Sequence, residues 1–212
     1  MPEHVLPADI ERSSMRIIGE ELRARSITLP EENAAVITRV IHATADFDFA
    51  RTLFFTPGAV QTGAAALSRG VDIVTDTNMA RAGVSKPGLQ KLGGQVFCFM
   101  AEPEIAALAK ERGTTRAAAS MQYAAEMYPS AVFAVGNAPT ALIRLHELIE
   151  ESAFAAEPAL IIGVPVGFVN VVESKELVIE NSSVPYIIAR GRKGGSNVAA
   201  AICNALIYQI TR

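Results

Sequence analysis

Apolar residues gather in five short runs along the second two-thirds of the chain. Each run is nearly continuous and ends at a turn rich in glycine, proline or polar residues. Continuous runs of four to eight residues are typical of strands buried on both faces, whereas half-exposed strands alternate apolar and polar positions. The pattern therefore predicts strands at 71–75, 95–100, 131–135, 159–163 and 186–189.

The segments between and around these runs have helical periodicity. We predict helices at 103–112, 115–128, 138–152, 170–180 and 195–210, and a further one from 57 to 68. Two more are predicted near the N-terminus. The first follows Asp9 as N-cap, with Ile10, Ile17, Ile18 and Leu22 on one stripe, and the second opens at Pro30 with Val36, Ile37, Val40 and Ile41 facing the core.

Strands that alternate with helices predict an α/β fold, in which an open five-stranded parallel sheet lies between two helical layers. The N-terminal helices are an addition to this three-layer sandwich. No linker or repeat divides the 212 residues, so we expect one domain over 1–212. Ligands of such folds bind beyond the carboxyl ends of the strands, so the residues after each strand are the candidates for chemistry.

Composition narrows the classes of function. The net charge of −3 argues against a general nucleic-acid binder, and the 50% hydrophobic content argues against disorder. Cys98 and Cys203 stand far apart, which favours reduced core thiols in a cytoplasmic protein over a disulfide or a zinc site. The first 14 residues do not resemble a signal peptide. The apolar stretch 159–172 is too short and too interrupted to span a bilayer, so no membrane partner is expected.

Several common sites have no sequence support. The turn after the first predicted strand is not a Gly-x-Gly-x-x-Gly fingerprint, and neither a phosphate-binding P-loop nor a Gly-x-Ser-x-Gly elbow occurs. The chain has three histidines, so a histidine-rich metal centre is not expected. His146 lies among leucines of a predicted helix, and we interpret it as structural.

Residues 190–196, Arg-Gly-Arg-Lys-Gly-Gly-Ser, bring three cations and three glycines between a strand and a helix. Backbone N–H groups at a helix start can hold an anion, although a flexible turn with solvated cations fits the composition equally well. The turn at Asn137 has the same two interpretations. Arg116 stands at the start of a predicted helix, where a cation opposes the helix dipole, so it is either solvated or drawn there by an anionic ligand.

His42 and Arg39 lie on the side of their helix that is opposite the apolar stripe. They therefore face water, a cleft or another subunit. A histidine can exchange a proton near neutral pH, and a neighbouring arginine can hold an anionic group beside it.

These residues belong to segments that together resemble the precorrin-8X methylmutase family of cobalamin biosynthesis. The segments follow one another in the family's order over nearly the whole chain; they are Glu11-Arg12-Ser13, 39–43, 136–142, 163–169 with Glu173-Ser174-Lys175, Asn181-Ser182, and 190–192 with 194–196.

The resemblance implies an isomerase that moves a methyl group from C11 to C12 of a corrinoid, with or without cobalt, and that uses no cofactor or protein-bound metal. It implies a flavodoxin-like sheet and a homodimer with its pocket near the subunit interface. The family's proton donor/acceptor falls on His42, and family substrate positions fall on Ser13 and Arg39. For a flat apolar ligand fringed by carboxylates, we add Arg116, Asn137, Arg190, Gly194, Gly195 and Ser196 as rim contacts, and Met79 and Phe168 as lining.

Three other functions stay open on the sequence. A non-catalytic corrinoid carrier would use the same pocket. A nucleotide-binding flavodoxin-like enzyme lacks its glycine fingerprint here, and a purely structural subunit would leave the Arg39 and His42 face unexplained. No residue decides whether the substrate carries cobalt.

Overall fold

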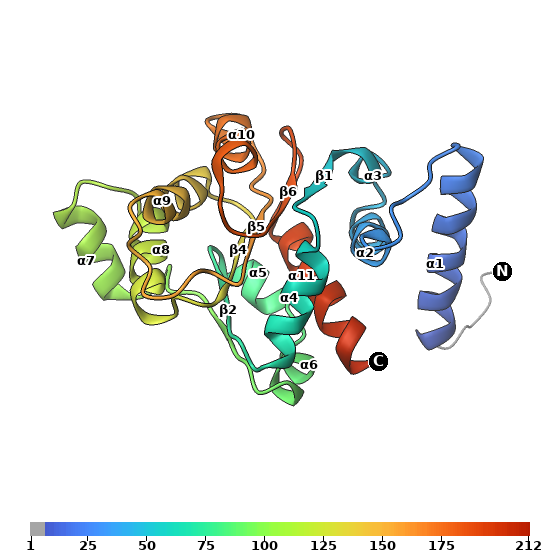
Figure 1. The fold of residues 1–212 in the computed structure, drawn as a ribbon, viewed down its shortest axis with the longest axis horizontal. Coiled ribbons are helices and arrows are strands. Elements are labelled where there is room, and N and C mark those ends of the chain that lie inside the picture. Colours follow the sequence, from blue (N-terminus) through green and yellow to red (C-terminus); the bar gives the residue numbers. More distant parts are fainter. Residues whose placement is uncertain (1–6) are drawn as a thin grey trace.

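Six strands form one sheet in the computed structural model, which describes residues 7–212 (Figure 1). The strand order is β1-β6-β5-β4-β2-β3, where β1 is antiparallel to β6 and the other neighbours are parallel. The strands are β1 (Leu53–Phe55), β2 (Ile73–Thr75), β3 (Val96–Phe97), β4 (Val132–Val135), β5 (Leu160–Gly163) and β6 (Tyr186–Ala189).

The five parallel strands confirm the five that the sequence predicts. Numbered among themselves, they follow the order 2-1-3-4-5 of doubly wound, flavodoxin-like sheets. The prediction of a purely parallel sheet is wrong at one edge, because β1 adds an antiparallel strand there. This strand has three residues and follows a helical turn directly, so it leaves no recognisable run in the sequence.

Two helical layers cover the sheet, as the sequence predicts. Side chains of β4 alternate between the layers: Val132 and Ala134 join one core, whereas Phe133 and Val135 join the other. The first core includes α2 (Ala34–Thr44), α4 (Ala59–Ser68) and α11 (Ser196–Thr211). The second core includes α8 (Arg116–Met127), α9 (Pro139–Glu150) and α10 (Val171–Asn181), and α7 (Pro103–Glu111) packs outside α8.

The N-terminal helices differ from the prediction in two details. Helix α2 begins at Ala34 and not at Pro30, because the Asn33 N–H donates to the Pro30 carbonyl at 3.0 Å and closes a turn first. In α1 (Pro7–Ala24), Ile18 and Leu22 are buried as expected, whereas Ile10 and Ile17 are exposed. Helix α1 stands outside α2 at one end of the molecule (Figure 1).

Three short helices escape the sequence pattern: α3 (Phe49–Thr52), α5 (Asn78–Gly83) and α6 (Lys86–Lys91). They have four to six residues, too few to display a helical repeat. No helix within residues 7–212 is both long and apolar enough to cross a membrane. The expectation that the first 14 residues are not a signal peptide concerns in part residues 1–6, which lie outside the described residues.

Candidate active site

The turns that follow β2, β4, β5 and β6 pack against one another at the carboxyl edge of the sheet. The hydroxyls of Thr77, after β2, and Ser196, at the start of α11, are hydrogen-bonded at 2.7 Å. The Gly195 N–H donates to the carbonyl of Val164, after β5, at 2.9 Å. The turns that the sequence predicts as candidates for chemistry are thus in contact with one another.

Two glycines permit this close packing. A Cβ on Gly136 would lie 2.8 Å from the Cα of Ser196, and a Cβ on Gly194 would collide with the carbonyl of Val164. Gly195 has a φ of +133°, which few side chains tolerate. Gly194 is therefore required by the packing of the turns, and Gly195 by its backbone conformation, whatever ligand they meet.

The carboxylate of Asp76, the residue after β2, lies in the turn after β4. From the sequence, that turn is a candidate anion site. The Asp76 carboxylate accepts hydrogen bonds from the backbone N–H groups of Gly136 at 2.8 Å, Asn137 at 2.8 Å and Ala138 at 2.7 Å. Asp76 is fully buried, and burial raises the pKa of its carboxyl while the three donors oppose that rise. The backbone donors of this turn thus already hold an anion from within the chain.

No motif in the sequence marks Asp76 as a site residue. The available signal is its position: it directly follows a fully buried strand at the point where the strand order reverses. With the donors at Asn137 engaged, the exposed Asn137 side chain is the part of that residue that faces outward.

The cations of segment 190–196 have partners at the protein surface. Arg190 pairs with Glu176 of α10 through two hydrogen bonds of 2.8 and 2.6 Å and lies over the ring of Phe54. Lys193 bridges the carboxylates of Asp46 and Asp48, at 2.7 and 2.6 Å.

Arg192 is exposed, and its guanidinium lies 5.3 Å from the ring centroid of Phe168. The segment is therefore an ordered turn rather than a flexible one, and its three ion pairs reach α10 on one side and the residues between α2 and α3 on the other.

Arg39 and His42 lie on α2 as the helical periodicity predicts, away from the core. Arg39 is half-buried: it donates to Glu11 of α1 at 2.6 Å and lies over the ring of Tyr208 on α11. The His42 side chain is exposed. Ser13 is also exposed, on α1 two residues beyond Glu11.

Two contacts place His42 relative to the carboxyl edge. Arg39 meets Tyr208 near the end of α11, whereas Asp46, just after α2, meets Lys193 just before α11, so the two helices run antiparallel. His42 lies between these contacts, about one helical turn from Asp46. The histidine therefore lies on α2 between Arg39 and Asp46, the residue that pairs with Lys193 of segment 190–196.

Arg116 lies on the other side of the sheet, at the first position of α8. The Thr115 hydroxyl caps this helix by accepting from the Ala118 N–H at 3.1 Å, and it bonds the Thr140 hydroxyl of α9 at 2.8 Å. The start of α8 at Arg116 and the turn at Asn137 that leads into α9 therefore lie next to each other. The predicted site residues form two groups, around α2 and around the starts of α8 and α9, with the carboxyl edge between them.

Large apolar side chains are exposed along the same edge. Met79, which follows β2, is 73% exposed, and Phe168, which follows β5, is 81% exposed. Val166 and Val169 are also exposed beside Phe168. Large exposed apolar side chains that gather at one edge are typical of a binding site or an interface between proteins.

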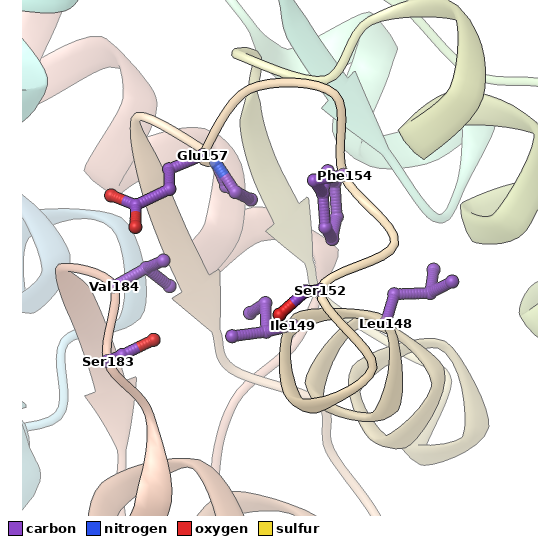
Figure 2. A pocket seen from close by; sticks show the side chains of 8 residues that line it. Leu148, Ile149, Ser152, Phe154, Glu157, Ser183 and Val184 are labelled. Carbon is purple, nitrogen blue, oxygen red and sulfur yellow. The ribbon is translucent and has the colours of Figure 1, made fainter.

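Several hollows lie away from this edge. One of about 280 Å³ lies at the amino edge, between the end of α9 and the turns that precede β5 and β6 (Figure 2). In that view the Glu157 carboxylate and the Phe154 ring stand on opposite sides of it (Figure 2). Within residues 7–212, no group of three or more His, Cys, Asp or Glu side chains is placed to hold a metal ion.

Fold and site together define a flavodoxin-like α/β protein whose carboxyl edge offers cations and apolar side chains, and whose backbone donors at the turn after β4 bind its own Asp76. The family model described as precorrin-8X methylmutase matches residues 9–209. The chain belongs to the precorrin-8X methylmutase family. It is an isomerase of cobalamin biosynthesis that moves a methyl group within one molecule, as the sequence resemblance implies.

Named relatives are similar over almost their whole length. The cobalt-precorrin-8 methylmutase of Priestia megaterium is 41% identical, over 97% of this chain and 89% of its own. The precorrin-8X methylmutase of Pseudomonas aeruginosa is 43% identical, over 93% of each chain. The solved precorrin-8x methyl mutase of Thermus thermophilus superposes with a TM-score of 0.82 at 38% identity, over 94% of this chain and 96% of that one.

Proposed function

We propose that the chain moves the methyl group from C11 to C12 of precorrin-8X or cobalt-precorrin-8, with His42 as the proton donor/acceptor. The observation that carries this proposal is the position of His42. It is exposed between Arg39 and segment 190–196, and that segment adjoins the exposed ring of Phe168. A proton-transfer group, cations and apolar surface thus meet at one edge.

The chemistry of the edge suits a corrinoid. Its macrocycle is flat and apolar and needs apolar contacts such as Phe168 and Met79, both exposed here. Its peripheral carboxylates need cations, for which Arg39, Arg116 and Arg192 are available around the edge.

The proposed role of His42 follows from the reaction. A methyl shift proceeds more easily when one end of the conjugated system is made electron-poor. Protonation of, or a hydrogen bond to, a ring nitrogen or neighbouring carbon by His42 does this, and an imidazole exchanges protons near neutral pH. Holding the macrocycle in one orientation and excluding water contribute the rest of the rate.

We further propose that two copies of the chain complete the site. The carboxyl edge exposes Met79, Val166, Phe168 and Val169, and α1 exposes Ile10 and Ile17. Apolar surface of this extent favours a partner, and a second copy closing over the edge would enclose the macrocycle and exclude water.

The whole chain acts as one catalytic domain in this proposal, which we place in the cytoplasm. The location is supported by the two free, buried cysteines, Cys98 and Cys203, because disulfides are typical of exported proteins.

An assay with metal-free and cobalt-containing substrate tests the proposal, since the chromophore changes colour on isomerisation. We expect many turnovers per chain with at least one of the two substrates, and the faster one identifies the natural form. Binding of at most one equivalent without turnover would instead identify a corrinoid carrier. No binding of either substrate or product would exclude a corrinoid function altogether.

A further inference from the structure

A buried lysine lies directly beneath segment 190–195. Lys175 belongs to the middle of α10, and its side chain is fully buried. Its ammonium donates hydrogen bonds to the backbone carbonyls of Gly191 at 2.7 Å and Lys193 at 2.9 Å. The carbonyl between them, that of Arg192, accepts from the Gly167 N–H at 3.2 Å. Three successive carbonyls of the segment are thus engaged from inside the protein.

The ammonium has no counter-charge at contact distance among residues 9–212. Glu176, the nearest acid that affects it, is hydrogen-bonded to Arg190. Burial of a charge without an ionic partner is costly, and here it lowers the pKa of Lys175 to about 8. A leucine or methionine would fill the same space without that cost, so packing alone does not explain a lysine at this position.

The two carbonyl contacts supply the explanation. Gly191 has a φ of +81° and Gly195 of +133°, which glycine adopts readily, but a glycine-rich segment loses much conformational freedom when it is ordered, and the two carbonyl contacts oppose that cost. When its carbonyls are held inward, the side chains of Arg190, Arg192 and Lys193 extend along the surface to Glu176, Phe168 and Asp46.

We propose that Lys175 is a positioning residue for the reaction: its ammonium clamps the backbone of segment 190–195 in the shape that receives the corrinoid carboxylates. Lys175 touches neither the substrate nor His42 in this role. The inference rests on the proposed function, because it assigns the segment to that substrate.

Lys175→Met tests the clamp, since it keeps the length of the side chain and removes the donors. Loss of the two donors should let the segment leave its shape and raise KM and the Kd of the product by roughly 10- to 100-fold. We expect kcat to change little, because His42 is untouched. Lys175→Arg, which keeps a charged donor, should restore part of the affinity.

Lys110→Met is the matched control, because Lys110 is an exposed lysine of α7 on the far side of α8. It should behave as the unsubstituted chain does. A folded Lys175→Met protein with unchanged KM and product Kd would overturn the proposal, and so would a loss of kcat with unchanged KM.

A second measurement needs no substitution at Lys175. Hydrogen exchange of segment 190–195, corrected for the intrinsic pH dependence of exchange, should lose protection between pH 7 and 9 as the ammonium deprotonates, and KM should rise over the same range. The charged groups around Lys175 are Glu176, Arg190, Arg192 and Lys193. Glu176 raises the pKa of Arg190, and Asp46 and Asp48 raise the pKa of Lys193, so these two cations stay charged over that range. Flat protection together with flat KM would overturn the proposal.

Global unfolding does not explain such a loss. Because the folded pKa of Lys175 lies below the ordinary 10.5, the unfolded chain binds more protons between about pH 8 and 10.5, so this group makes folding more favourable as pH rises through that window. The exchange experiment uses no substrate. It therefore distinguishes failure of the clamp from failure of the proposed function, which absence of turnover by the unsubstituted chain would show.

Discussion

Arg39 is held in place by two neighbours before any ligand arrives. Glu11 accepts a hydrogen bond from its guanidinium and the Tyr208 ring lies beneath it, while Arg212 shares both of these neighbours. A guanidinium fixed in this way loses less freedom when it binds a carboxylate. Its exposed part is then available to the rim of the macrocycle.

Arg39→Ala should weaken product binding about 10- to 100-fold, the equivalent of one hydrogen bond between charged groups. Titration of the chromophore measures this. Arg212→Ala is the control, because it removes the other partner of Glu11 and leaves Arg39 in place. Equal affinity of the Arg39→Ala and unsubstituted chains would remove Arg39 from the site.

His42→Ala should keep the fold and the product affinity while slowing isomerisation by about 10²- to 10⁴-fold, the usual contribution of general acid–base catalysis. Single-turnover absorbance measurements separate this step from binding. Isomerisation at the unsubstituted rate would show that another group transfers the proton.

The sequence predicts the positions of these side chains, but not all of their contacts. Helical periodicity alone places Arg39 and His42 off the core side of α2. The Glu11 contact spans 28 positions, and the Asp76 contacts span 60 to 62, so they depend on how α1 docks and on the strand order. Neither the docking of α1 nor the strand order can be recognised in the local sequence pattern.

Among the elements, those with a repeat of their own were predictable. The five parallel strands and the long helices each have enough residues to show a period. Strand β1 exists because β6 offers it a free edge, and α2 starts late because a turn at Pro30 competes for its first residues. Such competition between neighbouring structures is invisible in hydrophobicity alone.

Helix α1 provides a prediction at this scale. It is held on α2 by Ile18, Leu22 and the Glu11 ion pairs. Hydrogen bonds from Arg39, with a smaller contribution from Arg212, lower the pKa of Glu11 below the ordinary 4.5. This contribution to stability is therefore present above pH 4.5 and is lost as pH falls through the lowered pKa.

Acidification below about pH 4.5 should thus release α1 before the sheet opens, as hydrogen exchange by region can show. Glu11→Gln should show the same release at neutral pH. Glu20→Gln is the control on the same helix, since Glu20 pairs with Arg16 of α1 itself. Equal protection of α1 in all three proteins would contradict a tether at Glu11.

At the scale of the molecule, the strand order determines which turns meet. The order places the ends of β2 and β4 side by side, and Gly136, Gly194 and Ser196 then bring the turns after β4, β5 and β6 into contact. The site residues come from α1 through α11, so the site does not exist in any isolated part of the chain.

The proposed homodimer is tested at this scale. Light scattering should give twice the 22.5 kDa of one chain. Because each site would need its partner, turnover per chain should fall on dilution in step with dissociation. Full activity of a monomer would show that one chain suffices.

The carboxylate of Asp76 has one more consequence. The backbone donors of the turn after β4 bind it. Here the ligand of the turn is covalently part of the chain, at a fixed stoichiometry of one and with no exchange. The turn after β4 is therefore shaped by folding of the chain and needs no exchangeable anion from the solution.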